Sequence, residues 1–510
     1  MQKQLELIDC DDSAEFCSTL KRIEQLQSDY VARKSNQHKK SLGQFFTPAR
    51  VAQFMASFVS PPKGKKVRIL DSGAGIGILT AATVERCIEL GCEDIHAVLY
   101  ELDQEVVPYL IESMKLVIRS SKGRAKFTYE LVYKDFVLER PDKAAEKFDV
   151  SVINPPYFKY NVKTSPYGKA TTDLYKGNPN IYASFIAVAI ACMRNHGQVV
   201  VIAPRSFTNG LYFKGFRNYV CDTSSIENIH VFVARDQVFR SSNVLQENVI
   251  FKYVKKPQSN NITIGTSQSS VDIKQPLQRS YPVGLIIDSS NGERIIRIPE
   301  NKDKADILVR VQGLESTFTD AGYYISTGRV VDFRTKSYIT SDPKGVDAVP
   351  LLRTHNITPP KASWTGDHRK DRHFRLVDDY HKHLVANTNY VLLKRLSSKD
   401  ERRRLVAAVY TPNITQASFV GIDNKINYLG VRDGYLSHVE ADGLATLFNS
   451  TFFDKYFRCL SGNTQVNATE IRVLRFPSRA SIKKIGRKIQ PSEHLNQELV
   501  DRVVSKVLGI

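Results

Sequence analysis

The sequence predicts an α/β protein whose first half holds a mostly parallel sheet covered by helices. Between residues 67 and 254, short apolar runs alternate with segments of helical period, as expected for strands and crossover helices. A glycine-rich turn follows the first apolar run, and the last run follows its predecessor without a long helical segment between them. We therefore expect parallel strands and then an antiparallel edge strand.

The apolar, β-prone runs define the strands in chain order. We expect strands at Val67–Asp71, Ile95–Tyr100, Phe127–Val132, Phe148–Ile153, Gln198–Pro204 and Ile226–Val233, with the antiparallel edge strand at Asn248–Val254. Segments with apolar residues three and four positions apart predict helices at 78–90, 104–118, 180–194 and 211–221.

The alternation ends in a polar stretch, which predicts a domain boundary near 255–275. We expect an N-terminal helical segment at 1–40, a first domain at 41–260 and a second domain at 275–510. Mixed short strands and loops indicate an α+β second domain that ends in a helix at 493–508. The pattern does not predict how this second domain folds.

The charge is unevenly distributed between the two halves. The chain has 72 Lys and Arg against 53 Asp and Glu, a net charge of +19 over 510 residues. Residues 1–250 carry +5 of this charge and residues 251–510 carry +14. An excess of this size favours a nucleic acid or another anionic partner and indicates that the second half binds it.

Several classes of protein do not fit the sequence. The seven cysteines are odd in number and contain no C-x-x-C pair, so we expect neither a disulfide framework nor a zinc cluster. No signal peptide is recognisable, and the longest apolar run, Ile181 to Met193, is too short to span a bilayer. We expect a cytoplasmic monomer with no membrane association and no obligatory metal.

The first candidate site is the turn that links the first strand to the first crossover helix. It reads Asp71-Ser-Gly-Ala-Gly-Ile-Gly77, and glycines let the backbone pass close to a ligand because they have no Cβ. The spacing is G-x-G-x-G, with Ile78 where a dinucleotide site would have its third glycine. A nucleoside site and a tight turn without a ligand are both compatible with this motif.

Acidic residues follow the next two strands at the end where open α/β sheets bind ligands. Glu101 could accept hydrogen bonds from both hydroxyls of a ribose. Asp135 could accept from an exocyclic amine, and the neighbouring Phe136 could cover a flat base. Each of these acids, taken singly, could also be an ordinary solvated loop residue.

The fourth strand leads directly into Asn154-Pro155-Pro156-Tyr157. The two prolines fix φ and remove two N–H donors, so nearby carbonyl groups can face a ligand without local competition. Asn154 adds an amide oxygen and Tyr157 an aromatic face. Together these residues predict a socket for a planar group with an NH2, and this prediction is stronger than that of a merely rigid loop.

The order of these motifs resembles the γ class of DNA adenine-N6 methyltransferases, the TaqI type of type II restriction-modification systems. Gln44-Phe-Phe-Thr-Pro48 precedes the glycine turn, and the acidic residues and the Asn-Pro-Pro-Tyr loop follow in the family's order. Similar later segments lie at 238–240, 246–250, 449–450, 462–467, 470–472 and 476–477. The resemblance implies a Rossmann-like methyltransferase domain that uses S-adenosylmethionine, followed by a target-recognition domain.

The resemblance also implies roles for individual residues. Those that would enclose S-adenosylmethionine are Thr47, Pro48, Asp71, Gly73, Gly75, Glu101, Asp135 and Phe136. Those that would hold the target adenine are Asn154, Pro155, Pro156, Tyr157 and Phe239, the last two by stacking on the ring. The family has a different residue at the position of Ser72, which makes the contacts there less secure.

Such an enzyme would rotate an adenine out of duplex DNA and transfer a methyl group directly to its N6, without a metal. It would protect host DNA from a cognate restriction enzyme. The basic residues expected to contact the DNA are Arg369, Lys370, Arg402, Arg403, Arg472, Arg475, Lys483 and Lys484. The alternatives are a methyltransferase of protein glutamine or RNA amino groups and a DNA-specificity subunit without catalytic activity.

Overall fold

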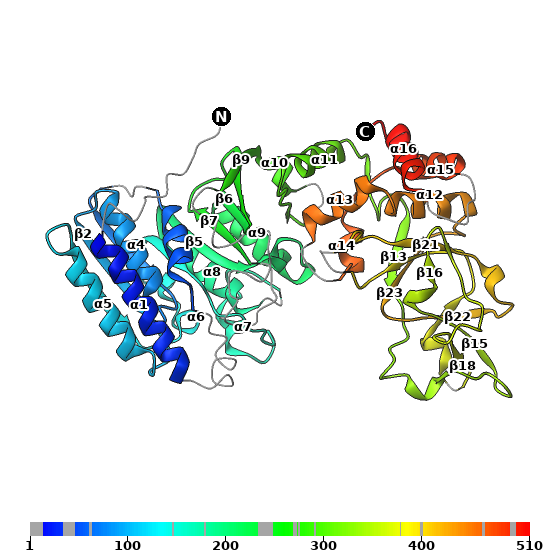
Figure 1. Ribbon diagram of the computed structural model, residues 1–510, viewed down its shortest axis with the longest axis horizontal. Coiled ribbons are helices and arrows are strands. Elements are labelled where there is room, and N and C mark those ends of the chain that lie inside the picture. Colours follow the sequence, from blue (N-terminus) through cyan, green and yellow to red (C-terminus); the bar gives the residue numbers. More distant parts are fainter. Residues whose placement is uncertain are drawn as a thin grey trace. The chain divides into compact units, whose positions relative to one another are not determined.

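The structure is a computed structural model that forms two compact units, Met1–Glu300 and Asn301–Ile510 (Figure 1). It describes residues 14–33, 46–60, 64–144, 147–177, 180–232, 248–268, 273, 276–289, 292–377, 379–397, 401–461, 465–489 and 496–510. The first unit is a mixed α/β structure built on a large central sheet, as predicted. Each unit is described separately below.

A nine-stranded sheet in the order β3-β2-β1-β4-β5-β7-β6-β8-β9 runs through the first unit. Its strands are β1 Lys66–Asp71, β2 Asp94–Tyr100, β3 Lys126–Val132, β4 Phe148–Ile153, β5 Met193–Pro204, β6 Ser225–Phe232, β7 Asn248–Val254, β8 Asn261–Ser267 and β9 Leu277–Pro282. Strands β1 to β5 are mutually parallel, so the loops after β1, β2, β3 and β4 lie along one edge.

Helices cover both faces of this sheet. They are α1 Ala14–Arg33, α3 Ala49–Ser57, α4 Ile78–Glu89, α5 Val107–Ser121, α6 Phe136–Glu139, α7 Pro166–Ala170, α8 Ile181–Cys192, α9 Lys214–Thr223 and α10 Val283–Ile286. Alternate strand residues face opposite cores: Ile69 packs with α1, α3, α4 and α5, whereas Leu70 packs with α8 and α9. Helix α8 is buried almost all round, which explains its continuous apolar run.

Two expectations about the end of this sheet differ from the structure. Strand β7 is antiparallel as predicted, but it lies between β5 and β6 instead of at an edge, and all seven of its residues are buried. The stretch 255–275, expected to be a domain boundary, contains β8, which pairs with β6. Strand β9 then pairs with β8, and the first unit continues to Glu300. These long-range pairings leave no local signal in the sequence.

Gly77 of the glycine turn and Gly91 allow the destabilising effects of steric overlap and of backbone strain to be measured separately. Gly77 has φ +87°, and a Cβ there would lie 2.7 Å from Cε of Met114 and 2.8 Å from Cδ1 of Leu110. Gly91 has φ +84° but no atom within 4 Å of the same position. We expect Gly91→Ala to cost about 1 kcal/mol of unfolding free energy from backbone strain, and Gly77→Ala about 2 kcal/mol more from overpacking. Urea unfolding of both variants measures the difference, and equal losses would contradict this account.

The second unit contains two sheets that share a core. The six-stranded sheet consists of β13 Tyr323–Thr327, β23 Ile426–Val431, β20 Tyr390–Lys394, β21 Ala407–Tyr410, β17 Lys361–Ala362 and β16 Ile357–Thr358. The five-stranded sheet consists of β14 Ile339–Thr340, β18 Arg372–Arg375, β15 Ala348–Leu352, β22 Phe419–Ile422 and β19 Leu384–Ala386. Val420 and Ile422 of one sheet pack with Leu392 and Tyr428 of the other.

Helices make up the remainder of this unit. They are α11 Lys302–Gln312, α12 His438–Phe448, α13 Thr451–Leu460, α14 Ala468–Arg472, α15 Arg479–Lys488 and α16 Gln497–Leu508. The last of these corresponds to the predicted terminal helix. Short strands complete the two units: β12 Ser316–Thr317 pairs with β24 Arg475–Phe476 in the second, and β10 Ile287–Asp288 pairs with β11 Ile295–Ile296 in the first.

Two further sequence-based expectations concern thiols and membranes. The cysteines whose side chains are described, Cys87, Cys92, Cys192, Cys221 and Cys459, are free thiols. Within the described ranges, no helix combines the length and the apolar character needed to cross a bilayer.

Candidate active site

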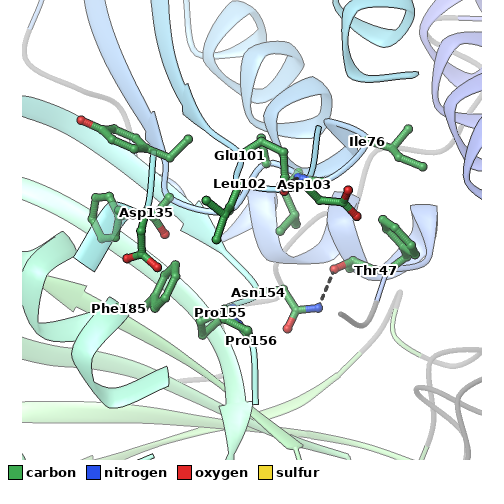
Figure 2. A pocket seen from close by; sticks show the side chains of 18 of the residues that line it. Thr47, Ile76, Glu101, Leu102, Asp103, Asp135, Asn154, Pro155, Pro156 and Phe185 are labelled. Atoms are coloured by element: carbon green, nitrogen blue, oxygen red, sulfur yellow. Dashed lines mark hydrogen bonds between the residues drawn. The ribbon is translucent and has the colours of Figure 1, made fainter. Parts of the chain in front are cut away.

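The loops that follow β1, β2, β3 and β4 line one cavity of about 280 Å³ at the carboxyl edge of the sheet (Figure 2). They bring together Ser72 to Ile76, Glu101 to Asp103, Lys134 to Phe136 and Asn154 to Pro156. Thr47, just before α3, completes the wall from a segment far away in the sequence. Most of the predicted site residues therefore face one space.

The glycine turn lies close to an aromatic ring and to Glu101. Gly75 has φ +52°, and a Cβ there would lie 3.4 Å from the ring of Phe46. The Gly75 N–H donates to Oε2 of Glu101 at 2.7 Å, while the Asp103 N–H donates to Oε1 at 2.8 Å. Glu101 thus joins the turn after β1 to the loop after β2, and burial raises the pKa of its carboxyl.

Ser72 gives the cavity an unused polar atom. Its side chain is 2% exposed and lines the cavity, and among the described residues no group hydrogen-bonds to its Oγ. A buried hydroxyl without a partner is costly unless a ligand satisfies it. Gly73 lines the same cavity, so this hydroxyl fits a polar ligand in the turn.

Asp71 supports the turn from below and is not part of the cavity wall. Its carboxylate accepts from Thr80 Oγ1 at 2.6 Å and from the Gly73 N–H at 3.4 Å. Burial raises the pKa of Asp71 to about 6, although these hydrogen bonds oppose the rise. Its geometry is that of a residue that positions the glycine turn.

The raised pKa of Asp71 predicts how stability depends on pH. The folded protein binds the proton more tightly than the unfolded chain does, so unfolding free energy falls as pH rises from about 4 to 6. The pKa difference corresponds to about 3 kcal/mol. We expect Asp71→Asn to lack this fall. The unfolding free energy of the wild type minus that of the variant should therefore decrease by about 3 kcal/mol between pH 4 and 7, as measured by chemical unfolding. Parallel curves for the two proteins would contradict the prediction.

Asp135 and Phe136 form the far wall of the cavity. Oδ1 of Asp135 caps α6 by accepting from the backbone N–H groups of Val137 and Leu138, both at 3.0 Å. Its other oxygen accepts from the Tyr167 hydroxyl at 2.6 Å. The ring of Phe136 packs against that of Phe185 with centroids 5.5 Å apart and planes inclined by 39°, so this wall combines a carboxylate with aromatic carbon.

Asn154 is held in place by residues on both sides of it. Its Nδ2 donates to Thr47 Oγ1 at 3.1 Å, the contact drawn in Figure 2, and its Oδ1 accepts from the Tyr157 hydroxyl at 2.8 Å. The Tyr157 hydroxyl also lies 3.2 Å from the carbonyl oxygen of Ile202. Burial raises the pKa of Tyr157 well above its usual range, so it remains a donor. The amide side chain is therefore oriented before any substrate binds.

Besides Asp71, two predicted residues lie outside the cavity lining, and a third falls outside the described part of the chain. Pro48 is the N-cap residue of α3 and accepts from the Ala52 N–H. Tyr157 lies beside the cavity, with its ring edge-on to Tyr182 at 6.2 Å. Phe239 lies outside the described residues.

Comparison with known proteins identifies the family. Residues 93–239 match the family model described as Eco57I restriction-modification methylase. The type II methyltransferase M.PstI of Providencia stuartii is 34% identical over 92% of this chain and 94% of its own length. The type II methyltransferase M.BsuBI of Bacillus subtilis is 33% identical over 92% of this chain and 95% of its own length. The chain is a type II DNA methyltransferase. It belongs to the methyltransferases of restriction-modification systems.

A solved structure shows the same fold. The type IIL restriction-modification enzyme MmeI, solved in complex with DNA, aligns with a TM-score of 0.55 at 12% identity. The alignment covers 98% of the methyltransferase chain and 75% of MmeI. At this low identity the likeness concerns the fold alone.

The structure adds residues to the cavity that the sequence did not indicate. Phe185 belongs to α8, whose apolar run looked like ordinary core, and Tyr167 belongs to the short helix α7, which carries no motif. Ser72 and Leu102 were neighbours of predicted residues, and Gln27 comes from α1. A signal existed only for Ser72, as a polar residue inside the glycine turn.

The predicted DNA-binding residues of the second unit differ in exposure and in whether their side chains already have partners within the protein. Arg369, Lys370, Arg402 and Lys484 are exposed. Three others donate to backbone carbonyl oxygens: Arg403 to Asn449, Arg472 to Ile325 and Arg475 to Leu314. Lys483 lies 3.9 Å from Glu440. The guanidinium groups in the second set already have a structural partner, so the exposed set is freer to meet phosphate.

Proposed function

We propose that this methyltransferase transfers a methyl group from S-adenosylmethionine to N6 of an adenine that has been rotated out of duplex DNA, and that it protects host DNA from a cognate restriction enzyme. The observation that carries the proposal is the oriented amide of Asn154 at the mouth of a cavity suited to a nucleoside. The relatives' membership of restriction-modification systems supports the DNA substrate.

The residues of the cavity fit S-adenosylmethionine. Glu101 would accept from the ribose hydroxyls through the lone pairs that Gly75 and Asp103 leave free. Asp135 and Phe136 would hold the adenine of the cofactor, with Phe185 adding apolar surface. The hydroxyl of Ser72 and the turn at Gly73 would receive its amino-acid end. When bound, the cofactor supplies a methyl group activated by a sulfonium centre.

The Asn154 loop would act on the target amine. Tyr157 donates to Asn154 Oδ1, and an amide oxygen has two lone pairs, so the same oxygen would also accept from the N6 amine. The carbonyl of Pro155 would accept the second N–H, and these two acceptors would hold the nitrogen and its lone pair toward the methyl group. The catalytic contribution is alignment and polarisation, with no covalent intermediate on the protein.

Access to N6 requires the base to leave the duplex, because the reacting atom lies inside the helix. The second unit would read the target sequence and neutralise phosphates through its exposed basic residues. MmeI, which shares this fold, was solved in complex with DNA, and this supports DNA as the partner.

A direct assay tests the function. Purified protein is incubated with labelled S-adenosylmethionine in three separate reactions, which contain duplex DNA, RNA or a protein extract. We expect label only in duplex DNA, and mass spectrometry of the digested DNA should yield N6-methyladenine. Methylcytosine as the product would contradict the target base, and label only in RNA or protein would contradict the substrate class.

A further inference from the structure

Four segments of the second unit meet at one end of its five-stranded sheet. Strands β15 and β22 are parallel and end together, with Leu352 beside Ile422, and β18 begins beside the end of β15. Val330 forms a bridge with Asp423. The segments 331–336, 353–356, 365–371 and 423–425 therefore lie at this end of the sheet. We call these four segments the basic edge.

Two carboxylates hold the segments of the basic edge together. Asp332 binds Arg353 at 2.7 Å and Lys425 at 3.3 Å, which joins three of the segments. Asp371 is 5% exposed and joins the fourth segment, 365–371, to segment 353–356. Its carboxylate accepts from His355 Nε2 at 2.7 Å and from the Gly366 N–H at 3.1 Å.

The outer surface of the basic edge is cationic and carries an exposed ring. Phe333 is 78% exposed, and the guanidinium of Arg334 lies over its ring at 5.3 Å from the centroid. Arg369 and Lys370 are exposed at the tip of the 365–371 segment. Arg334, Arg369 and Lys370 have no ion pair with any described residue. The acids of the edge are buried or paired except for the exposed Asp367.

The unpaired cationic side chains and the exposed ring of the basic edge suit a nucleic acid better than an acidic protein. Arg and Lys side chains without an ion pair can neutralise phosphates and so release counterions from the DNA. An exposed aromatic ring interacts weakly with water and can instead stack on a base. The bonds of Asp332 and Asp371 fix the segments before binding, so less conformational entropy is lost on association.

We propose that the basic edge is a duplex DNA contact surface of the second unit, with Arg369 and Lys370 at the phosphates and base edges and Phe333 against a base. The inference deepens the proposed function, because it assigns the DNA contact to particular residues. It adds Phe333 and Arg334, which composition alone did not single out.

The opposite end of β23 supplies a matched control. One segment of the basic edge, 423–425, comes just before β23, whereas Arg432 and Tyr435 come just after this strand. Tyr435 is 84% exposed, and Arg432 is also exposed. The double variant Arg432→Ala/Tyr435→Ala thus removes the same types of side chain as Phe333→Ala/Arg334→Ala, but away from the basic edge. Arg369→Ala/Lys370→Ala tests the second part of the edge.

The experiment measures binding of each full-length protein to a fluorescent duplex of mixed sequence over a range of salt concentrations. We expect each edge variant to bind at least about tenfold more weakly, with a salt dependence reduced by about one to two phosphate contacts. The control should bind within about twofold of wild type. Circular dichroism and cofactor binding check that all variants fold.

The outcomes separate this inference from the proposed function. If wild type methylates duplex DNA but the edge variants bind like the control, the inference is overturned and the function stands. If wild type binds duplex DNA through the edge but methylates no DNA, the inference stands and the function is overturned. Absence of duplex binding by wild type overturns both.

Discussion

The rate of methyl transfer by Asn154→Ala should fall by about 10²–10³-fold or more, the range observed when one pre-oriented hydrogen-bonding group is removed from an active site. The expectation follows from geometry, because the hydrogen bonds with Thr47 and Tyr157 fix the orientation of this amide. Single-turnover measurements with saturating cofactor and DNA report the chemical step directly.

Binding measurements and a second Asn variant make this test specific. Asn154→Ala should bind S-adenosylhomocysteine and duplex DNA within a few fold of wild type, since neither depends on the amide. Asn161→Ala, which removes an exposed Asn a few residues further along the chain, should react at the wild-type rate. Tyr157→Phe should be intermediate, because it removes only the hydroxyl that orients Asn154. Wild-type activity in Asn154→Ala would refute the proposed mechanism.

The second large effect is expected on cofactor affinity. Glu101→Ala should weaken binding of S-adenosylmethionine by about 10- to 100-fold, because a hydrogen bond to a charged group contributes about 1.5–3 kcal/mol. The same change removes the acceptor for the Gly75 and Asp103 N–H groups, so the glycine turn also loses its link to the loop after β2. Isothermal titration calorimetry with S-adenosylhomocysteine measures the loss.

Two variants define what the Glu101 result means. Glu101→Gln keeps one carbonyl oxygen but turns an NH2 toward the second backbone donor, so its affinity should lie between that of wild type and that of Glu101→Ala. Asp94→Asn changes an acid at the opposite end of β2, where it pairs with Lys66 at the surface. It should bind the cofactor normally. Unchanged affinity in Glu101→Ala would exclude Glu101 from the cofactor site.

Much of the site could be predicted because parallel strands end at a common edge. The residues that follow β1, β2, β3 and β4 are adjacent in space even though dozens of residues separate them in the chain. Glu101, Asp135 and Asn154 were found in this way, and the cavity brings them together. The strands themselves were predictable because their apolar runs are bounded by polar loops.

Other parts of the site could not be predicted because they depend on packing between distant segments. Phe185 faces the cavity from a helix that is apolar all round, so its sequence does not distinguish a lining residue from a core residue. The bond between Thr47 and Asn154 joins residues 107 positions apart. The interior place of β7 depends on β6, β8 and β9 extending the sheet beyond it.

The sequence by itself determined the chain order of strands β1 to β7, the edge where the loops after β1 to β4 gather and the rigid proline loop after β4, because hydrophobic period and proline and glycine chemistry act locally. The tertiary structure alone decided that Asp71 supports the turn from below, that Tyr157 orients Asn154, and that Phe333 shares an edge with Arg369. These facts depend on which buried groups find hydrogen-bond partners and which strand ends coincide, and both are settled only when segments far apart in the chain pack together.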